Sequence, residues 1–230
     1  MAIDLTDGRP WVLLPGTLCS GAVFDGVLAA LGVAGAARRP LAMRHPSVED
    51  YLPELRAACS PGAVVCGFSL GALVAAQLAD RLPAGAFVLF GLNPHADDPA
   101  KRPDRQALAA EVTGQGGAAA MGGRLPPLYG SDPEGARRLI LDMADKTAGD
   151  IVAQTGLALS RPDALPALSR CRAPVGLFTG TQDGVTPLAL AQTAAAAAPE
   201  GRALGLAGLG HYALIEDPAA CAAAVLRWQG

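Results

Sequence analysis

The segment Gly67-Phe68-Ser69-Leu70-Gly71 carries the residue types of an activated serine nucleophile. A serine hydroxyl is a weak nucleophile unless a base takes its proton, and both substrate and base must be able to reach it. A tight turn between a strand and a helix meets these needs, with flanking glycines because side chains there would clash with neighbouring backbone. About 0.1 such motifs would arise by chance in a chain with 28 glycines among 230 residues. The segment therefore predicts a nucleophilic Ser69.

The base must come from one of only three histidines, His45, His95 and His211. In this kind of site the serine is followed along the chain by an acid and then by the histidine. His211 fits that order, whereas His45 precedes Ser69 and His95 comes before any late acid. We therefore expect His211 to be the general base and the other two histidines to lie in surface loops.

Asp183 is the first choice for the acid that orients the base. It closes the apolar run 175–179 through a short polar turn. Asp97 and Asp98 follow the preceding apolar run and are the competing choice, although their proline-flanked loop also suits a solvated segment. Both positions follow the carboxyl ends of expected strands, which is the sheet edge where sites in parallel sheets form.

Short apolar runs alternate with helical segments along most of the chain. Such runs suit strands buried on both faces, and the alternation predicts an α/β fold with a mostly parallel sheet and helices on both faces. We expect about six strands in one domain over residues 1–230. The recognisable strands are at 11–14, 63–66, 86–90, 175–179 and 202–206, and the helices at 22–31, 48–59, 71–82, 188–197 and 218–228, the last capped by Asp217.

The interval 93–171 interrupts this alternation because it holds no strand-like run. It opens polar and proline-rich, passes through a glycine-rich stretch at 114–123 that offers hinge positions and that we expect to be mobile, and continues with helices at 133–144 and 147–159. Ser131 or Asp132 could cap the first of these. A helical insertion between two strands has the form of a lid, although a linker pair of helices has the same pattern.

Charge and cysteine content exclude several classes of protein. The net charge is −3 with no basic run, so nucleic acid is not an expected partner. The five cysteines are odd in number and contain no C-x-x-C pair, so neither a disulfide framework nor a metal site is expected, and a reducing, cytoplasmic location fits. Residues 1–7 carry two acids where a signal peptide would be basic.

An uncharged stretch at 57–79 is long enough to span a bilayer as one helix. Pro61 and Gly62 break its start, and Gly67, Ser69 and Gly71 interrupt its middle. A buried strand, a sharp turn and a buried helix explain the same residues without lipid. We therefore expect no membrane span here.

In four ordered segments the chain resembles the α/β-hydrolases of the esterase and lipase type, over nearly its whole length. The segments are LLPGT at 13–17, GFSLG at 67–71, GTQDGVTP at 180–187 and GHYALIEDP at 210–218. The resemblance implies that Ser69 is the nucleophile, that His211 is the general base and then the acid, and that Asp183 orients and stabilises the imidazolium. It implies no cofactor.

An oxyanion hole needs two N–H donors beside the nucleophile. The backbone N–H of Leu70 is one expected donor because it follows Ser69 at the start of a helix. The resemblance places the other at Thr17, with Leu18 the next choice. Pro15 stands where the family commonly has a histidine.

The resemblance implies hydrolysis of a small-molecule carboxylic ester through an acyl-enzyme. Alternatives on the same fold are a carboxylesterase for methyl esters linked to acyl-carrier protein, a C–C bond hydrolase and an acyltransferase. A ligand-binding member without turnover is the alternative from another class.

Two groups of side chains bear on the substrate. An acidic carrier protein would need a basic surface, and five arginines could supply it or be ordinary solvated side chains: Arg137, Arg138, Arg161, Arg170 and Arg172. Apolar residues of the insertion predict a pocket for small to medium acyl chains. They are Met121, Leu125, Leu128, Tyr129, Leu139, Ile140, Met143, Ile151 and Val152.

Overall fold

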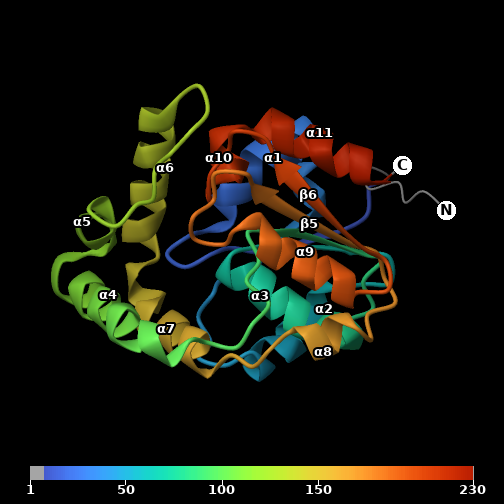
Figure 1. Cartoon of the computed structure of the whole chain (residues 1–230), viewed down its shortest axis with the longest axis horizontal. Helices are drawn as coiled ribbons and strands as arrows, with labels where there is room; N and C mark the ends of the chain where they lie inside the picture. The colour runs from blue at the N-terminus through green and yellow to red at the C-terminus, as the bar shows by residue number, and fades with distance from the viewer. Residues whose placement is uncertain (1–7, 230) are drawn as a thin grey trace.

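Six strands form one parallel sheet with the order β2-β1-β3-β4-β5-β6 in the computed structural model, which describes residues 8–229 (Figure 1). The strands are Trp11–Leu14 (β1), Arg38–Pro40 (β2), Val64–Phe68 (β3), Ala86–Phe90 (β4), Val175–Gly180 (β5) and Gly201–Leu206 (β6). The α/β fold and the six strands predicted from the sequence are confirmed. Residues 1–7, whose acids argued against a signal peptide, lie outside the described residues.

The edge strand β2 was not recognised in the sequence. Arg39 and Pro40 are exposed, and among the strands of residues 8–229 β2 pairs with β1 alone, Arg38 lying opposite Trp11. An edge strand of three residues needs no continuous apolar run, so the pattern that identified the buried strands is missing here.

Helices cover both faces of the sheet (Figure 1). Val12 and Leu14 of β1 point into the core beneath one helical layer, whereas Trp11 and Leu13 point into the core beneath the other. The first layer contains Leu52–Ala58 (α2), Leu70–Gln77 (α3), Leu165–Leu168 (α8) and Leu188–Ala197 (α9), and the second Asp25–Ala30 (α1), Ala213–Glu216 (α10) and Pro218–Gln229 (α11). Asp217 caps α11 as predicted, accepting a hydrogen bond of 2.9 Å from the Ala220 N–H.

Short 3₁₀ turns connect or extend these elements at Gly21–Phe24, Gly35–Ala37, Glu49–Tyr51, Ala79–Arg81, Pro99–Lys101 and Ala148–Asp150. The uncharged stretch 57–79 contains the end of α2, then β3 and α3. In the described part of the chain, no helix combines the length and apolar character needed to cross a membrane.

Between β4 and β5 the chain forms a separate helical layer beside the sheet (Figure 1). Its helices are Arg102–Gln115 (α4), Gly117–Gly122 (α5), Pro133–Lys146 (α6) and Ile151–Ser160 (α7), and α8 follows. The two predicted helices correspond to α6, which Asp132 caps through a 2.8 Å bond from the Gly135 N–H, and α7.

The glycine-rich stretch 114–123 is largely helical. It contains the last two residues of α4 and all of α5. Gly117 lets α5 approach α6 closely, since a Cβ there would lie 2.0 Å from the Ala144 carbonyl oxygen. The sequence prediction missed α4 because that helix is largely polar and exposed.

Candidate active site

Ser69 lies in the sharp turn between β3 and α3, with φ 50° and ψ −113°. This is left-handed backbone that a non-glycine residue adopts only when its surroundings enforce it. The two glycines around it have no room for a side chain. A Cβ on Gly67 would lie 2.5 Å from Ala72 Cα, and one on Gly71 would lie 2.0 Å from the Leu14 carbonyl oxygen. Backbone contact thus explains both glycines of the motif.

The structure brings Ser69, His211 and Asp183 together from the loops that follow β3, β6 and β5. His211 Nε2 lies 3.2 Å from Ser69 Oγ, and its Nδ1 lies 2.8 Å from Asp183 Oδ2. With the Nδ1–H group donating a hydrogen bond to the carboxylate, Nε2 of the neutral ring is the free base facing the serine hydroxyl. In this arrangement His211 can take the proton of the Ser69 hydroxyl.

Asp183 is held by its own loop as well as by His211. The backbone N–H groups of Val185 and Thr186 each donate to Oδ1 at 2.8 Å, and the Thr186 hydroxyl donates to Oδ2 at 2.7 Å. Burial alone would raise the pKa of Asp183, but hydrogen bonding to His211 and Thr186 and the charge of His211 bring it below its usual value. The sequence analysis missed Thr186, whose only signal is its place three residues after the acid.

Two further residues, Glu216 and Gly91, contact the loop that carries His211. Glu216 is buried and accepts a 2.6 Å bond from the Gly210 N–H, and burial raises its pKa. Gly91, at φ 59°, lies so close to the imidazole that a Cβ would be 3.2 Å from His211 Cε1. Neither residue was singled out in the sequence, because its role depends on contacts between distant loops.

The two candidates for the second oxyanion donor are placed differently. The Leu18 N–H donates to the buried Gln154 side chain of α7 at 2.9 Å, so this donor is engaged. Thr17 lines the cavity at Ser69 together with Leu70. The geometry therefore favours Thr17 over Leu18, and Gln154 is a link to the insertion that the sequence did not reveal.

The competing acids, Asp97 and Asp98, interact with other groups than His211. Arg105 binds the Asp97 carboxylate through both Nε, at 3.0 Å, and Nη2, at 2.6 Å. Arg161 Nη2 lies 3.3 Å from the same carboxylate. Asp98 accepts a bond from the Ala100 N–H at the start of a 3₁₀ turn. Both acids thus organise the start of the insertion.

The other two histidines pair with carboxylates elsewhere. His45 Nε2 lies 3.3 Å from Glu54, and His95 Nδ1 lies 3.3 Å from Asp163. Within residues 8–229, no group of three or more His, Cys, Asp or Glu side chains is placed to hold a metal ion.

Two cavities meet at Ser69, and both include Thr17, Lys101, Arg105 and Val185 in their walls. The smaller measures about 220 Å³ and adds Leu70, Leu73, Gly91, Asn93, Arg161 and Thr186. The larger measures about 380 Å³ and adds Phe68, Asp104, Leu108, Met121, Arg124, Pro126, His211 and Tyr212.

The insertion lines the larger cavity with apolar residues, Leu108, Met121 and Pro126, that are mostly not the expected ones. Met121 is the one residue of that predicted group in either cavity wall. Ile140 and Met143 are buried in the core beside the sheet, and Val152 is 69% exposed. The buried members of the predicted group are thus used for packing, and the wall of the larger cavity combines other apolar residues with charged ones.

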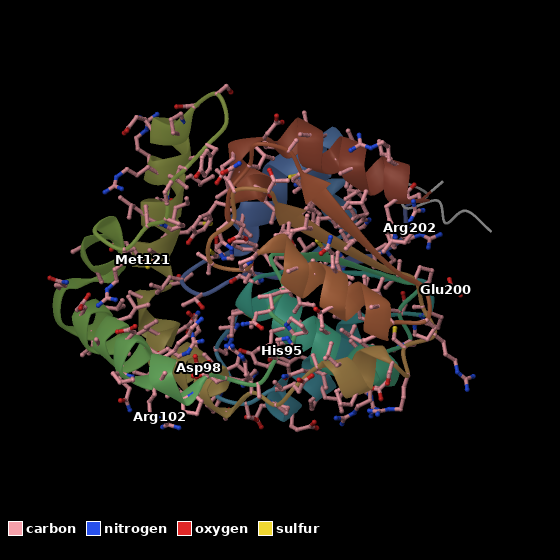
Figure 2. The ribbon with its side chains drawn as sticks, in the orientation of Figure 1. His95, Asp98, Arg102, Met121, Glu200 and Arg202 are labelled. Atoms are coloured by element: carbon pink, nitrogen blue, oxygen red, sulfur yellow. The ribbon has the colours of Figure 1, made fainter. Side chains whose placement is uncertain are left out.

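The five arginines considered for a carrier surface do not lie together. Arg170 pairs with Asp80 at 2.7 Å and lies with Arg172 beside Glu200, which Figure 2 shows at the edge of the molecule opposite Met121. Arg161 is buried at the smaller cavity, and Arg137 donates to the Gly122 carbonyl. One continuous basic surface is therefore absent among these residues.

A parallel sheet with helices on both faces, and a serine in a strand-to-helix turn at its carboxyl edge, is the scaffold of one class of enzymes. The Alpha/beta hydrolase family matches residues 7–224, and the chain belongs to that family.

Particular relatives are similar over most of their length. The pimeloyl-[acyl-carrier protein] methyl ester esterase of Aromatoleum aromaticum is 30% identical, with 78% of each chain covered. A thermophilic esterase from Thermogutta terrifontis superposes with a TM-score of 0.83 at 19% identity, covering 96% of this chain and 89% of its own. The enol-lactonase from Burkholderia xenovorans LB400 gives 0.76 at 20% identity, covering 96% and 91%.

Proposed function

We propose that the chain hydrolyses carboxylic esters of small molecules through an acyl-enzyme on Ser69. The observation that carries the proposal is the ordered contact from Asp183 through His211 to Ser69 Oγ, at 2.8 and 3.2 Å. Family membership and the esterases among the similar proteins support the reaction class.

In the first half of the reaction, Ser69 Oγ attacks the ester carbonyl carbon while His211 Nε2 takes the hydroxyl proton. The backbone N–H groups of Leu70 and Thr17 stabilise the oxyanion. Collapse of the intermediate breaks the bond to the alcohol oxygen, and the alcohol leaves with the proton from His211.

In the second half, His211 removes a proton from water, which attacks the acyl-enzyme. Collapse releases the carboxylic acid and returns the proton to Ser69 Oγ. Asp183 stays ionised throughout and stabilises the imidazolium in both halves.

The test combines labelling with turnover. A fluorophosphonate should add one phosphonyl group, found on Ser69 by peptide mass spectrometry, and Ser69→Ala should lower kcat/KM for p-nitrophenyl acetate by about 10⁴-fold or more. Ser131→Ala, at an exposed serine of the insertion, is the matched control and should retain both properties. Turnover that survives in Ser69→Ala would refute the proposal, and an unlabelled wild-type serine would favour a binding protein without turnover.

A second candidate is the methyl ester of an acyl group carried on acyl-carrier protein. The relative from Aromatoleum aromaticum, whose name states this activity, favours it. Its test compares kcat/KM for a carrier-linked methyl ester with that for the free methyl ester of the same acid. Little or no preference for the carrier-linked form would leave the small-molecule ester as the substrate.

Transfer and carbon–carbon cleavage by the same triad are separable from ester hydrolysis by their products. Hydrolysis in H₂¹⁸O places one ¹⁸O atom in the released acid, whereas transfer to another alcohol or amine gives a new ester or amide. An acyltransferase would therefore show little ¹⁸O acid in the presence of its acceptor. A C–C bond hydrolase would leave simple esters intact.

A further inference from the structure

The smaller cavity at Ser69 carries a concentration of positive charge. Lys101, Arg105 and Arg161 all contribute to its wall, from the last residue of a 3₁₀ turn, the first turn of α4 and the residue after α7. The Arg161 side chain is only 8% exposed and that of Arg105 27%. A charge brought out of water in this way needs a partner of opposite sign.

Asp97 supplies only part of the negative charge that these cations need. Its side chain is 6% exposed, and it is shared between the two arginines: Arg105 contacts both of its oxygens, and Arg161 makes a single contact of 3.3 Å. Arg161 also donates through Nε to the His95 carbonyl at 3.2 Å. Across residues 8–229 the guanidinium of Arg161 makes no further hydrogen bond. Donor capacity is therefore left over at the wall of the cavity.

The charge balance at this wall is positive. Three cations line the smaller cavity and Asp97 is the carboxylate behind them, while Asp104 belongs to the wall of the larger cavity. Burial lowers the pKa of Arg161, the neighbouring Arg105 lowers it further, and Asp97 opposes both. An additional anion would relieve the repulsion between the two guanidinium groups.

We infer that Lys101, Arg105 and Arg161 form a subsite for a carboxylate of the substrate, whose ester group lies at Ser69 in the same cavity. The inference rests on the proposed function and names its substrate class: half-esters of short dicarboxylic acids. The guanidinium forks favour a carboxylate because Arg105 already binds both oxygens of the protein's own carboxylate, Asp97, with Nη2 2.6 Å from Oδ1 and Nε 3.2 Å from Oδ2. The larger cavity, lined by Phe68 and Met121 among others, takes the other part of the ester.

The kinetic test compares monomethyl glutarate with dimethyl glutarate, which differ by one charge at nearly equal length. The ratio of their kcat/KM values should favour the half-ester by about tenfold or more in the wild type. Lys101→Met should lower that ratio by about tenfold, and Arg161→Gln should lower it more. Lys101 is exposed, so its variant is expected to fold even if the buried Arg161 variant does not.

Arg172→Gln is the matched control because it also removes one positive charge, from an exposed side chain beside Glu200. Its ratio should equal that of the wild type. A wild type that hydrolyses p-nitrophenyl acetate but does not prefer the half-ester would overturn the subsite while leaving the proposed function intact. An equal loss of preference in Arg172→Gln would assign the effect to net charge and overturn it too.

A binding readout separates the subsite from turnover. Glutarate should raise the Tm of the Ser69→Ala protein, and less so after Lys101→Met is added. No shift with glutarate would overturn the inference whatever the outcome for ester hydrolysis. A larger shift with inorganic phosphate at equal concentration would also overturn it, because the site would then select phosphate.

Discussion

The turn that carries Ser69 and the insertion whose residues line the cavities at Ser69 are stabilised by different contacts. At the turn, backbone lies against backbone, because Gly71 meets the Leu14 carbonyl, and in the loop after β5 backbone N–H groups hold the Asp183 carboxylate. In the insertion, long side chains make the contacts, with Arg105 and Arg161 on Asp97. Side-chain pairs can be exchanged without moving a strand, whereas backbone contacts cannot. The proposed chemistry thus belongs to the rigid region and the proposed selectivity to the adaptable one.

The largest effect expected from this contrast is a loss of turnover when asparagine replaces Asp183, compared with the same replacement at Asp97. Asp183→Asn should lower kcat/KM for p-nitrophenyl acetate by about 10⁴-fold, because the amide no longer holds the imidazole with Nε2 free. Asp97→Asn should change that rate far less, since Asp97 pairs with Arg105 and Arg161 rather than with His211. Steady-state kinetics on both variants decides the matter, and the reverse order of damage would move the acid to the earlier loop.

The next effect concerns folding and compares two glycines. Gly71→Ala should prevent native folding or lower the Tm steeply, because its Cβ would lie 2.0 Å from the Leu14 carbonyl oxygen. Gly114→Ala lies near the end of α4, where nothing is within 4 Å of the added Cβ. It should stabilise the protein by about 0.5–1 kcal/mol, since alanine is the better helix former. Thermal unfolding followed by circular dichroism measures both, and equal effects would contradict the contrast.

The sequence predicted most of the rigid region because its constraints are local. The strand–turn–helix around Ser69 needs glycines at fixed positions, and the chain order of Ser69, Asp183 and His211 limits the search. The adaptable region was poorly predicted. No pattern in the chain shows that Asp97 pairs with Arg161, 64 positions later, or that Gln154 binds the Leu18 N–H. Such contacts join residues that are far apart in the sequence and form only when the insertion packs beside the sheet.

A smaller effect on turnover is expected from Thr186, which contacts the acid of the proposed triad. Thr186→Val removes the hydroxyl that donates to Asp183 Oδ2 at 2.7 Å and leaves the backbone bonds in place. We expect kcat to fall about tenfold with KM little changed, because Asp183 then holds His211 less firmly. Thr186→Ser keeps the hydroxyl and should restore most of the rate. Equal losses in the two variants would contradict this, because Thr186→Ser keeps the hydroxyl that donates to Asp183.

The lowered pKa of Asp183 predicts how stability changes with pH. A carboxyl group whose pKa is lower in the folded than in the unfolded chain contributes stability that is complete above about pH 4. That contribution disappears as the pH falls through the folded pKa. The free energy of unfolding of Asp183→Asn should therefore vary less than that of the wild type at the acid end. Urea titrations from pH 7 downward test this, with Glu134→Gln at an exposed carboxylate of α6 as control.

The smallest expected effect is on the cysteines, all five of which are buried and free. Burial raises the pKa of Cys19 to about 12 and that of Cys59 to about 11, and it also raises that of Cys66, next to the Ser69 turn. Thiolate is the reactive form, so these thiols should be almost inert in the native protein. Iodoacetamide at neutral pH should leave ester turnover unchanged and alkylate all five cysteines only after unfolding, as intact mass spectrometry would show. Native alkylation of Cys66 with parallel loss of turnover would mean that the strand beneath Ser69 opens, contrary to the rigidity assigned to this region.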